Sequence, residues 1–262
     1  MTQRMPAVFI GHGSPMNTLE RNRYTAAWQA LGRALPRPRA ILAISAHWYI
    51  DRTAVTAMAQ PTTIHDFGGF PDALFQFQYP APGEPQLAAR LRELLAPVAV
   101  TLDQSEWGLD HGTWSVLAHL YPKADVPVVQ LAIDRTAPNQ FHYDLGQRLK
   151  VLRDDGVLIL GSGNVVHNLR RIKFAPNAPA EDWAVSFEGD VRRALEARDH
   201  PALIDYPGLG PAARLAVPTP EHYLPLLYVI GAQDEDESAR IAVDGIELGT
   251  ISMLSVAVGG AL

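Results

Sequence analysis

Residues 7–15 read AVFIGHGSP, a short apolar run that ends in a histidine between two glycines. An apolar run followed by a histidine recurs at residues 40–48, AILAISAHW, and at residues 157–168, VLILGSGNVVHN. Short apolar runs bounded by glycine or polar residues are typical of strands that are buried on both faces of a sheet. We therefore predict three buried strands, each followed by a histidine.

Strands and helices are expected to alternate along the chain. Apolar runs predict strands at Ala7–Ile10, Ala40–Ala46, Pro127–Ile133, Val157–Leu160 and Ile251–Val258. Amphipathic stretches predict helices at Tyr24–Leu35, Glu84–Leu95, Thr113–Tyr121, Asn139–Leu152, Glu181–Ala197 and His222–Gly231, and Asp205–Pro220 is predicted as an irregular loop. Such alternation favours the α/β class: one domain over residues 1–262, with a mostly parallel central sheet and helices on both faces.

Composition narrows the classes of function. Hydrophobic residues make up 47% and charged residues 19% of the chain, which is ordinary for a folded protein with a sizeable core. With 22 Lys+Arg against 28 Asp+Glu, the net charge of −6 argues against nucleic acid as a partner. The absence of cysteine excludes disulfides, thiolate metal sites and a thiol nucleophile.

The sequence also bears on where the protein works. The residues before the first strand contain no long apolar core of the signal-peptide kind, and no run approaches the length that spans a bilayer. We therefore expect a cytoplasmic protein without a membrane partner.

The placement of the histidines is the most informative feature. His12, His47 and His167 each follow a predicted strand, and His222 can join them from the start of a helix. In open α/β sheets, ligands bind at the carboxyl ends of the strands, so these side chains are expected to converge. Because neutral imidazole is a good ligand for divalent cations, the pattern predicts one metal site at that edge of the sheet.

Two other sites are considered and set aside. Gly161 and Gly163 after a strand resemble the opening of a dinucleotide fingerprint, but Val166 stands where the third glycine is required. Ser14, Ser45 and Ser162 lie near the histidines, but none sits in a Gly-x-Ser-x-Gly motif, so a nucleophilic serine is unsupported.

Two more histidines lie in loops. His111, in DHGTW at residues 110–114, is read either as an acid/base group near the metal or as a residue that fastens its loop. His65 lies in IHDFGGF at residues 64–70, a glycine-rich and aromatic loop that could close over a substrate.

Taken together, the histidine motifs resemble those of the class III extradiol ring-cleavage dioxygenases, and most closely their bacterial DOPA-cleaving branch. The resemblance covers residues 9–258 in family order. The motifs that carry it are GHGSP at 11–15, SAHW at 45–48, IHDFGGFP at 64–71, DHGTW at 110–114, SGNVVHN at 162–168 and TPEHYLPL at 219–226.

The resemblance implies oxygen-dependent opening of a catechol ring beside its two hydroxyls, at one divalent metal ion. It assigns His12, His47 and His222 as metal ligands, His167 as a ligand or an acid/base group, and His111 as a group that touches substrate or dioxygen. Fe(II) is the expected active metal, and Zn(II) can occupy the site as isolated because it binds nitrogen ligands more tightly.

Several points stay open at this stage. Glu221 and His222 are adjacent, and adjacent helical residues diverge by about 100°, so only one of them is expected to reach the metal. His65, Trp48 and Tyr223 are the candidate substrate contacts, with Phe67, Phe70 and Trp114 as further possible walls, and Arg135, Arg170 and Arg171 are candidates to bind a substrate carboxylate.

The expected partners are an aromatic catechol and O2, in a monomer or a homodimer. Two other functions remain: a zinc-dependent hydrolase that uses metal-bound hydroxide, and a metal-binding protein of the same fold without turnover.

Overall fold

An eight-stranded sheet runs through the centre of the molecule. The structure, a computed structural model, describes residues 4–175 and 178–259, so the ends of the predicted 1–262 domain lie outside the described residues. The strand order is β4-β3-β5-β2-β6-β1-β10-β7. These strands are β1 (Ala7–Gly11), β2 (Ala40–Ile50), β3 (Thr53–Thr56), β4 (Val100–Asp103), β5 (Val128–Asp134), β6 (Val157–Gly163), β7 (Ala239–Val243) and β10 (Ser255–Val258). A separate pair comprises β8 (Ile246–Glu247) and β9 (Ile251–Ser252).

The centre of the sheet is parallel. Strands β5, β2, β6 and β1 pair in parallel, with Ser45 opposite Ser162 and Gly11 opposite Gly163. Strands β10 and β7 add an antiparallel edge, and β3 meets β5 antiparallel. The predicted mostly parallel α/β sheet is confirmed, with an antiparallel edge that the sequence did not predict.

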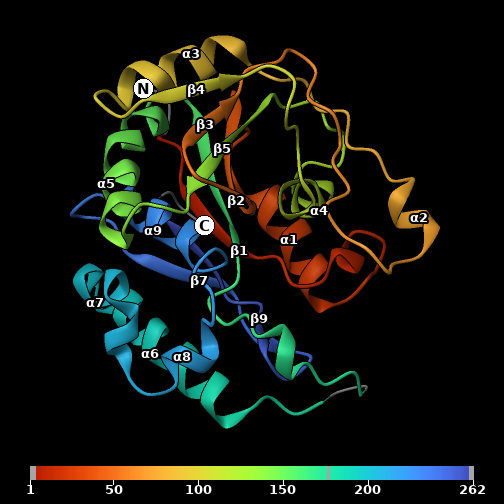
Figure 1. Ribbon diagram of the computed structural model, residues 1–262, viewed down its shortest axis with the longest axis vertical. Helices are drawn as coiled ribbons and strands as arrows, with labels where there is room; N and C mark the ends of the chain where they lie inside the picture. Colours follow the sequence, from red (N-terminus) through yellow and green to blue (C-terminus); the bar gives the residue numbers. More distant parts are fainter. Residues whose placement is uncertain (1–3, 176–177, 260–262) are drawn as a thin grey trace.

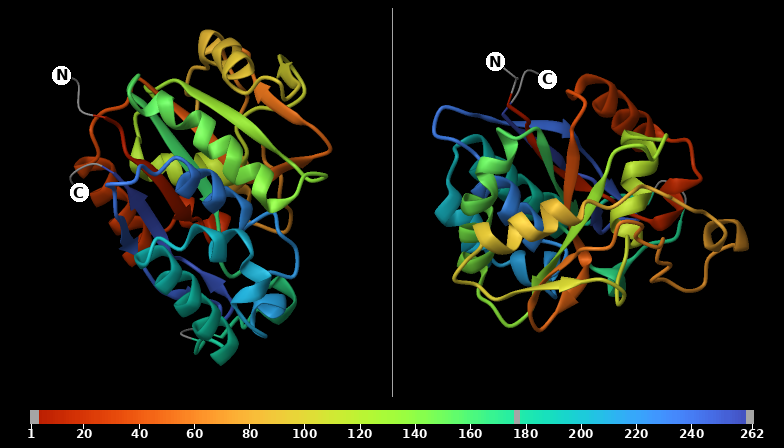
Figure 2. Two further views of the ribbon diagram at one scale, coloured as in Figure 1. Left: turned by 90° about the vertical axis from the view of Figure 1, so that its left-hand side faces the viewer. Right: turned by 90° about the horizontal axis from the view of Figure 1, so that it is seen from above.

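Helices cover both faces of the sheet. The helices are α1 (Arg23–Ala34), α2 (Asp72–Phe75), α3 (Pro85–Leu94), α4 (His111–Leu120), α5 (Asn139–Leu149), α6 (Asp182–Glu196), α7 (His200–Ile204), α8 (Ala213–Ala216) and α9 (Leu224–Gly231). Short 3-10 turns are η1 (Pro15–Thr18), η2 (Lys150–Arg153), η3 (Leu169–Arg171) and η4 (Tyr206–Leu209). Helices α1 and α4 lie on one side of the sheet and α5 and α9 on the other (Figures 1 and 2).

The two-residue period of β1 explains these two layers. Ala7 and Phe9 point into the core beneath α5 and α9, whereas Val8 and Ile10 point into the core beneath α1 and α4. All four are fully buried. The absence of polar residues from this run follows from burial on both faces.

Some predicted boundaries were wrong. The predicted strand Ile251–Val258 divides into β9 and β10, because β9 pairs with β8 while β10 pairs with β1. The predicted loop Asp205–Pro220 contains the short helices η4 and α8. Strands β3, β4 and β7 were missed because they are short. In addition, β7 is an edge strand in which exposed residues alternate with partly buried ones, so it forms no apolar run.

Two helix starts also differ from the prediction. Helix α4 begins at His111 because the Asp110 side chain accepts a hydrogen bond from the Thr113 amide and caps the first turn. Helix α9 begins at Leu224 with Pro225 in its first turn, so His222 lies in the preceding turn. Within the described ranges, no helix combines the length and apolarity needed to cross a bilayer.

Replacement of Phe187 by Ala tests the core on the α6 side. Phe187 is fully buried, so its truncation should lower the free energy of unfolding by about 3–5 kcal/mol, measured by denaturant titration. Val185→Ala in the same helix is the control, because Val185 is 53% exposed and should change stability by less than about 0.5 kcal/mol. Equal losses in the two variants would contradict this packing.

Candidate metal centre

Three neighbouring strands bring histidines to one edge of the sheet. His12 directly follows β1, and its amide donates to the Gly163 carbonyl at the end of β6. His47 was expected just after a strand but lies inside β2, where the pairing of β2 with β5 shifts register between Ile44 and Tyr49. Because β6 lies between β1 and β2, these ends are adjacent in space.

His12, His47 and His222 form a compact group. Each offers a ring nitrogen, and the three nitrogens lie within 4.8 Å of one another. The Nε2 atoms of His12 and His47 are 3.4 Å apart. His222 reaches the group from the turn before α9, which is fastened to β6 because the Asn164 amide donates to the His222 carbonyl.

Neighbouring groups set which nitrogen faces the centre. The Nδ1 atom of His12 lies 3.0 Å from Ser162 Oγ, whose own hydroxyl donates to the Gly112 carbonyl. Ser162 therefore accepts the Nδ1 proton, and His12 keeps a free lone pair on Nε2. On His222, Glu221 Oε1 is 3.3 Å from Nδ1, which likewise leaves Nε2 available. This arrangement favours His222 over Glu221 as the ligand.

The carboxylate of Asp66 contacts two histidines, His47 and His111. Asp66 Oδ2 lies 3.2 Å from His47 Nδ1, and Asp66 Oδ1 lies 2.9 Å from His111 Nδ1. Oδ1 also accepts a hydrogen bond from the His111 amide. Burial alone would raise the pKa of Asp66, but the contacts with His111 and His47 outweigh it and lower that pKa. Asp66 was missed in the sequence, although its position next to His65 in a histidine motif was a signal.

Burial keeps the clustered imidazoles neutral. It lowers the pKa of His47 to about 3 and that of His167 to about 4, and it lowers the pKa values of His12 and His222 well below 6.5. The mutual repulsion of the ring charges adds to the effect. Two neutral acceptor nitrogens that face each other repel unless a cation lies between them, so the donor set fits a divalent metal ion.

His111 and His167 flank the three-histidine group. The His111 ring centroid is 3.8 Å from that of His47. The His167 ring stacks on His222 at 3.5 Å with an angle of 9°, and its nitrogens group with Glu221 and His222 rather than with His12 and His47. This placement favours His167 as a group beside the metal over His167 as a ligand.

A cavity of about 390 Å³ opens above these histidines. The histidines and Asp66 form its polar floor. Its apolar walls include Phe67, Phe70, Leu169, Ile172, Phe174, Leu248 and Ile251. A mostly apolar cleft with a few convergent polar groups is the usual form of a small-molecule site.

Three residues that were predicted to contact substrate lie away from the cavity above the histidines. Trp48 stacks on the Trp107 ring, and the Tyr223 hydroxyl donates to the Leu203 carbonyl in the core. The His65 Nε2 atom contacts the carbonyl of Phe77. None of the three lines the cavity above the histidines. Their roles in binding substrate stay predictions.

Known proteins resemble this chain over nearly its whole length. Residues 7–259 match a family described as the catalytic LigB subunit of aromatic ring-opening dioxygenase. A protein of Escherichia coli strain K12 named "4,5-DOPA dioxygenase extradiol" is 54% identical over 262 residues, which cover 98% of this chain and 95% of that protein. A Beta vulgaris protein of the same name is 38% identical over 251 residues and covers 93% of this chain and 92% of its own length.

One solved structure is also similar. The crystal structure of an uncharacterized Escherichia coli K12 protein superposes with a TM-score of 0.86 and 50% sequence identity. The match covers 98% of this chain and 100% of that chain.

Gly163→Ala should weaken metal binding. A Cβ atom at Gly163 would lie 2.1 Å from the His222 carbonyl oxygen, so the turn that carries His222 must move. We expect about tenfold weaker Zn²⁺ or Co²⁺ affinity by calorimetry, as for other changes that displace a ligand's support. Gly68→Ala is the control, because a Cβ atom there meets nothing within 4 Å. Unchanged affinity in Gly163→Ala would argue against His222 as a ligand.

Acid should destabilise the metal-free protein. The folded-state pKa values of His12, His47, His167 and His222 lie below the unfolded value of 6.5, so the unfolded chain takes up protons first as the pH falls. Each such histidine should cost about 1 kcal/mol of stability per pH unit below about pH 6.5. Thermal unfolding between pH 7 and pH 5 measures this slope. His47→Gln should flatten it, and an identical slope would refute the neutral cluster.

Proposed function

The chain belongs to the family described as the catalytic LigB subunit of aromatic ring-opening dioxygenase, so it is an extradiol ring-cleavage enzyme, and we propose that it opens a catechol such as DOPA. The resemblance drawn from the histidine motifs is confirmed. The observation that carries the proposal is the convergence of three neutral imidazoles below an apolar cavity of about 390 Å³.

The family and the histidine cluster indicate a single metal ion. We propose that His12, His47 and His222 hold it and that Fe(II) is the active form, with Zn(II) as a tighter-binding substitute. When bound, such an ion supplies a Lewis acid for the two adjacent hydroxyls and, as Fe(II), a redox centre that dioxygen can use.

The cavity walls orient the substrate. A flat aromatic ring fits between apolar side chains such as Phe67 and Phe70, which also keep water away from the histidines. The reaction breaks the ring bond between a hydroxyl-bearing carbon and its unsubstituted neighbour. Both atoms of O2 enter the product, which carries a carboxylate on one carbon and an aldehyde on the other.

His111 and His167 are the candidates to move the phenolic protons. The Nδ1 side of His111 is occupied by Asp66, so Nε2 is the nitrogen that remains for substrate. The carboxylate also stabilises the ring of His111 when it is protonated. His167, stacked on His222, lies on the opposite flank of the group. We propose that one of the two accepts a proton on binding and returns it during ring opening.

Other parts of the proposal concern the whole protein. We propose that residues 1–262 act as one catalytic domain whose partners are an aromatic substrate and O2. The monomeric or homodimeric state and the cytoplasmic location expected from the sequence stay predictions.

Anaerobic reconstitution with Fe(II), followed by oxygen and DOPA, tests the function. Oxygen uptake with a yellow ring-opened product supports it. Absence of oxygen uptake by the iron form with a panel of catechols would reject it. Ester or amide hydrolysis by the zinc form would instead favour a hydrolase, and no activity in either assay would favour a binding protein.

Two histidine variants should behave differently in that assay. His12→Ala should lose metal, because it removes one of the three proposed ligands. Ser162, which contacts His12 Nδ1 in the unaltered protein, cannot replace that bond. His111→Gln should retain stoichiometric metal and lower kcat about 10²-fold or more, because a proton carrier is lost. Metal content by emission spectroscopy, measured beside turnover, separates the two. Metal loss in His111→Gln would reassign that residue as a ligand.

A further inference from the structure

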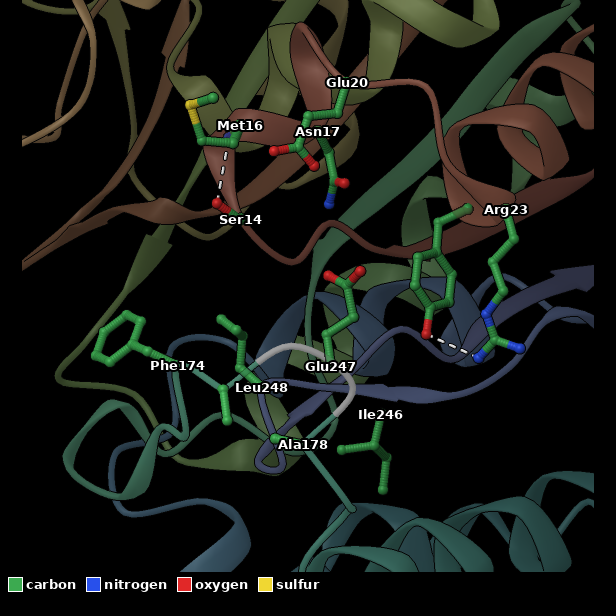
Figure 3. Close-up of a pocket in the computed structure, with 12 residues that line it drawn as sticks. Ser14, Met16, Asn17, Glu20, Arg23, Phe174, Ala178, Ile246, Glu247 and Leu248 are labelled. Carbon is green, nitrogen blue, oxygen red and sulfur yellow. Dashed lines mark hydrogen bonds between the residues drawn. The ribbon is translucent and has the colours of Figure 1, made fainter.

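A second cavity adjoins the one above the histidines. It has a volume of about 630 Å³, and its walls come from the segment after β1 and the start of α1, from the loop before α6, and from β8 (Figure 3). The two cavities share Ser14, Phe174 and Leu248 as wall residues. The two cavities therefore lie on either side of these residues, and a substrate that spans both would pass between their side chains.

The second cavity is charged where the first is apolar. Glu20, Glu247 and Arg23 line it, whereas no Arg or Lys is among the described residues around the histidine cavity. In Figure 3 the Glu247 carboxylate extends into the cavity toward Asn17 and Glu20, with Arg23 to one side. A charged substituent on the catechol would thus find both cationic and anionic partners here, whereas the charged side chain around the histidine cavity, among the described residues, is Asp66, which contacts His47 and His111.

Among the described residues, no ion pair joins the charged side chains that line this cavity. Among the described residues, no carboxylate lies within ion-pair distance of Arg23, whose guanidinium donates to the Tyr24 hydroxyl at 2.8 Å and to the Asp244 carbonyl at 3.4 Å. Burial and the charge of Glu20 raise the pKa of Glu247, while a hydrogen bond from Asn17 and the charge of Arg23 oppose them. A cation beside Glu247 would relieve that repulsion.

Asn17 connects the two sites directly. Its Nδ2 atom donates to the His12 carbonyl at 3.2 Å, and its side chain also hydrogen bonds to the Glu247 carboxylate. Glu247 is therefore one side chain away from the backbone of a proposed metal ligand.

We propose that this cavity binds the α-amino acid head group of the substrate, with Glu247 receiving the ammonium and Arg23 the carboxylate. The inference rests on the proposed function, since it places the catechol at the histidines. On this proposal, residues of β8 and α1 give the enzyme a preference for catechols that carry an amino acid head group. The earlier candidates Arg135, Arg170 and Arg171 are not among the described residues that line either cavity.

Four catechols whose side chains carry different charges test the assignment. DOPA carries both charges, dopamine only the ammonium, dihydrocaffeate only the carboxylate, and methylcatechol neither. For the iron form, kcat/KM should fall about tenfold with each charge removed from the substrate, as expected for the loss of a charge-assisted hydrogen bond. Equal kcat/KM for DOPA and methylcatechol would overturn the proposal.

Variants then assign each charge to a residue. Glu247→Gln should lose about tenfold more on DOPA and dopamine than on methylcatechol, and Arg23→Gln about tenfold more on DOPA and dihydrocaffeate. Misfolding or metal loss would lower all four values together, so metal content and circular dichroism are measured for each variant, and a uniform loss in a folded, metal-loaded variant would overturn the proposal. Arg33→Gln on the same helix and Glu235→Gln are matched controls at exposed sites, and their substrate preference should equal that of the unaltered protein.

Binding to the zinc-loaded protein separates this inference from the proposed function. Calorimetry with the same four catechols needs no turnover. Tighter binding of DOPA than of methylcatechol that is lost in Glu247→Gln supports the head-group cavity even if the iron form opens no ring. Equal affinities with active ring opening would leave the enzyme assignment in place and overturn the head-group cavity.

Discussion

The structure depends on the burial of several neutral imidazoles around one point. Burial lowers the pKa values of His12, His47 and His222, and each Nδ1 lies beside a hydroxyl or carboxylate that leaves the opposite nitrogen free. Such a cluster is unfavourable by itself, because lone pairs face one another in a region of low polarity. A bound cation turns the same arrangement into a stabilising one, which couples the fold of this edge to its chemistry.

The sheet supplies the rigidity that this cluster needs. Strands β1, β6 and β2 are adjacent and parallel, so their carboxyl ends present side chains at fixed spacing. Gly163 allows the turn with His222 to approach β6, and Gly112 allows α4 to approach His47, since a Cβ at either position would overlap its neighbour. The buried Asp110 side chain accepts a hydrogen bond from Ser45 Oγ and caps α4, which joins β2 to the helix that carries His111.

The two cavities differ in polarity and are proposed to bind different parts of the substrate. The histidine cavity offers apolar walls to an aromatic ring, and the neighbouring cavity offers Glu247 and Arg23 to a polar substituent. With this separation, the histidines can carry out ring opening while Glu247 on β8 and Arg23 on α1 select the substrate. Phe174, exposed and shared by both cavities, marks the border between them.

The amino-acid sequence by itself determined the α/β class, the three buried strands and the histidines that follow them, because burial on both faces leaves a local apolar pattern. It also determined the family, through motifs that are contiguous in the chain. Only the tertiary structure decided that Asp66 contacts both His47 and His111, that Glu221 lies beside His222 Nδ1, and that Trp48 and Tyr223 pack away from the cavity. Most of these facts depend on contacts between residues far apart in the chain, which local patterns do not specify, and the contact of Glu221 with His222 depends on the turn before α9. The cavity beside Glu247 likewise exists only where β8, α1 and the loop before α6 come together.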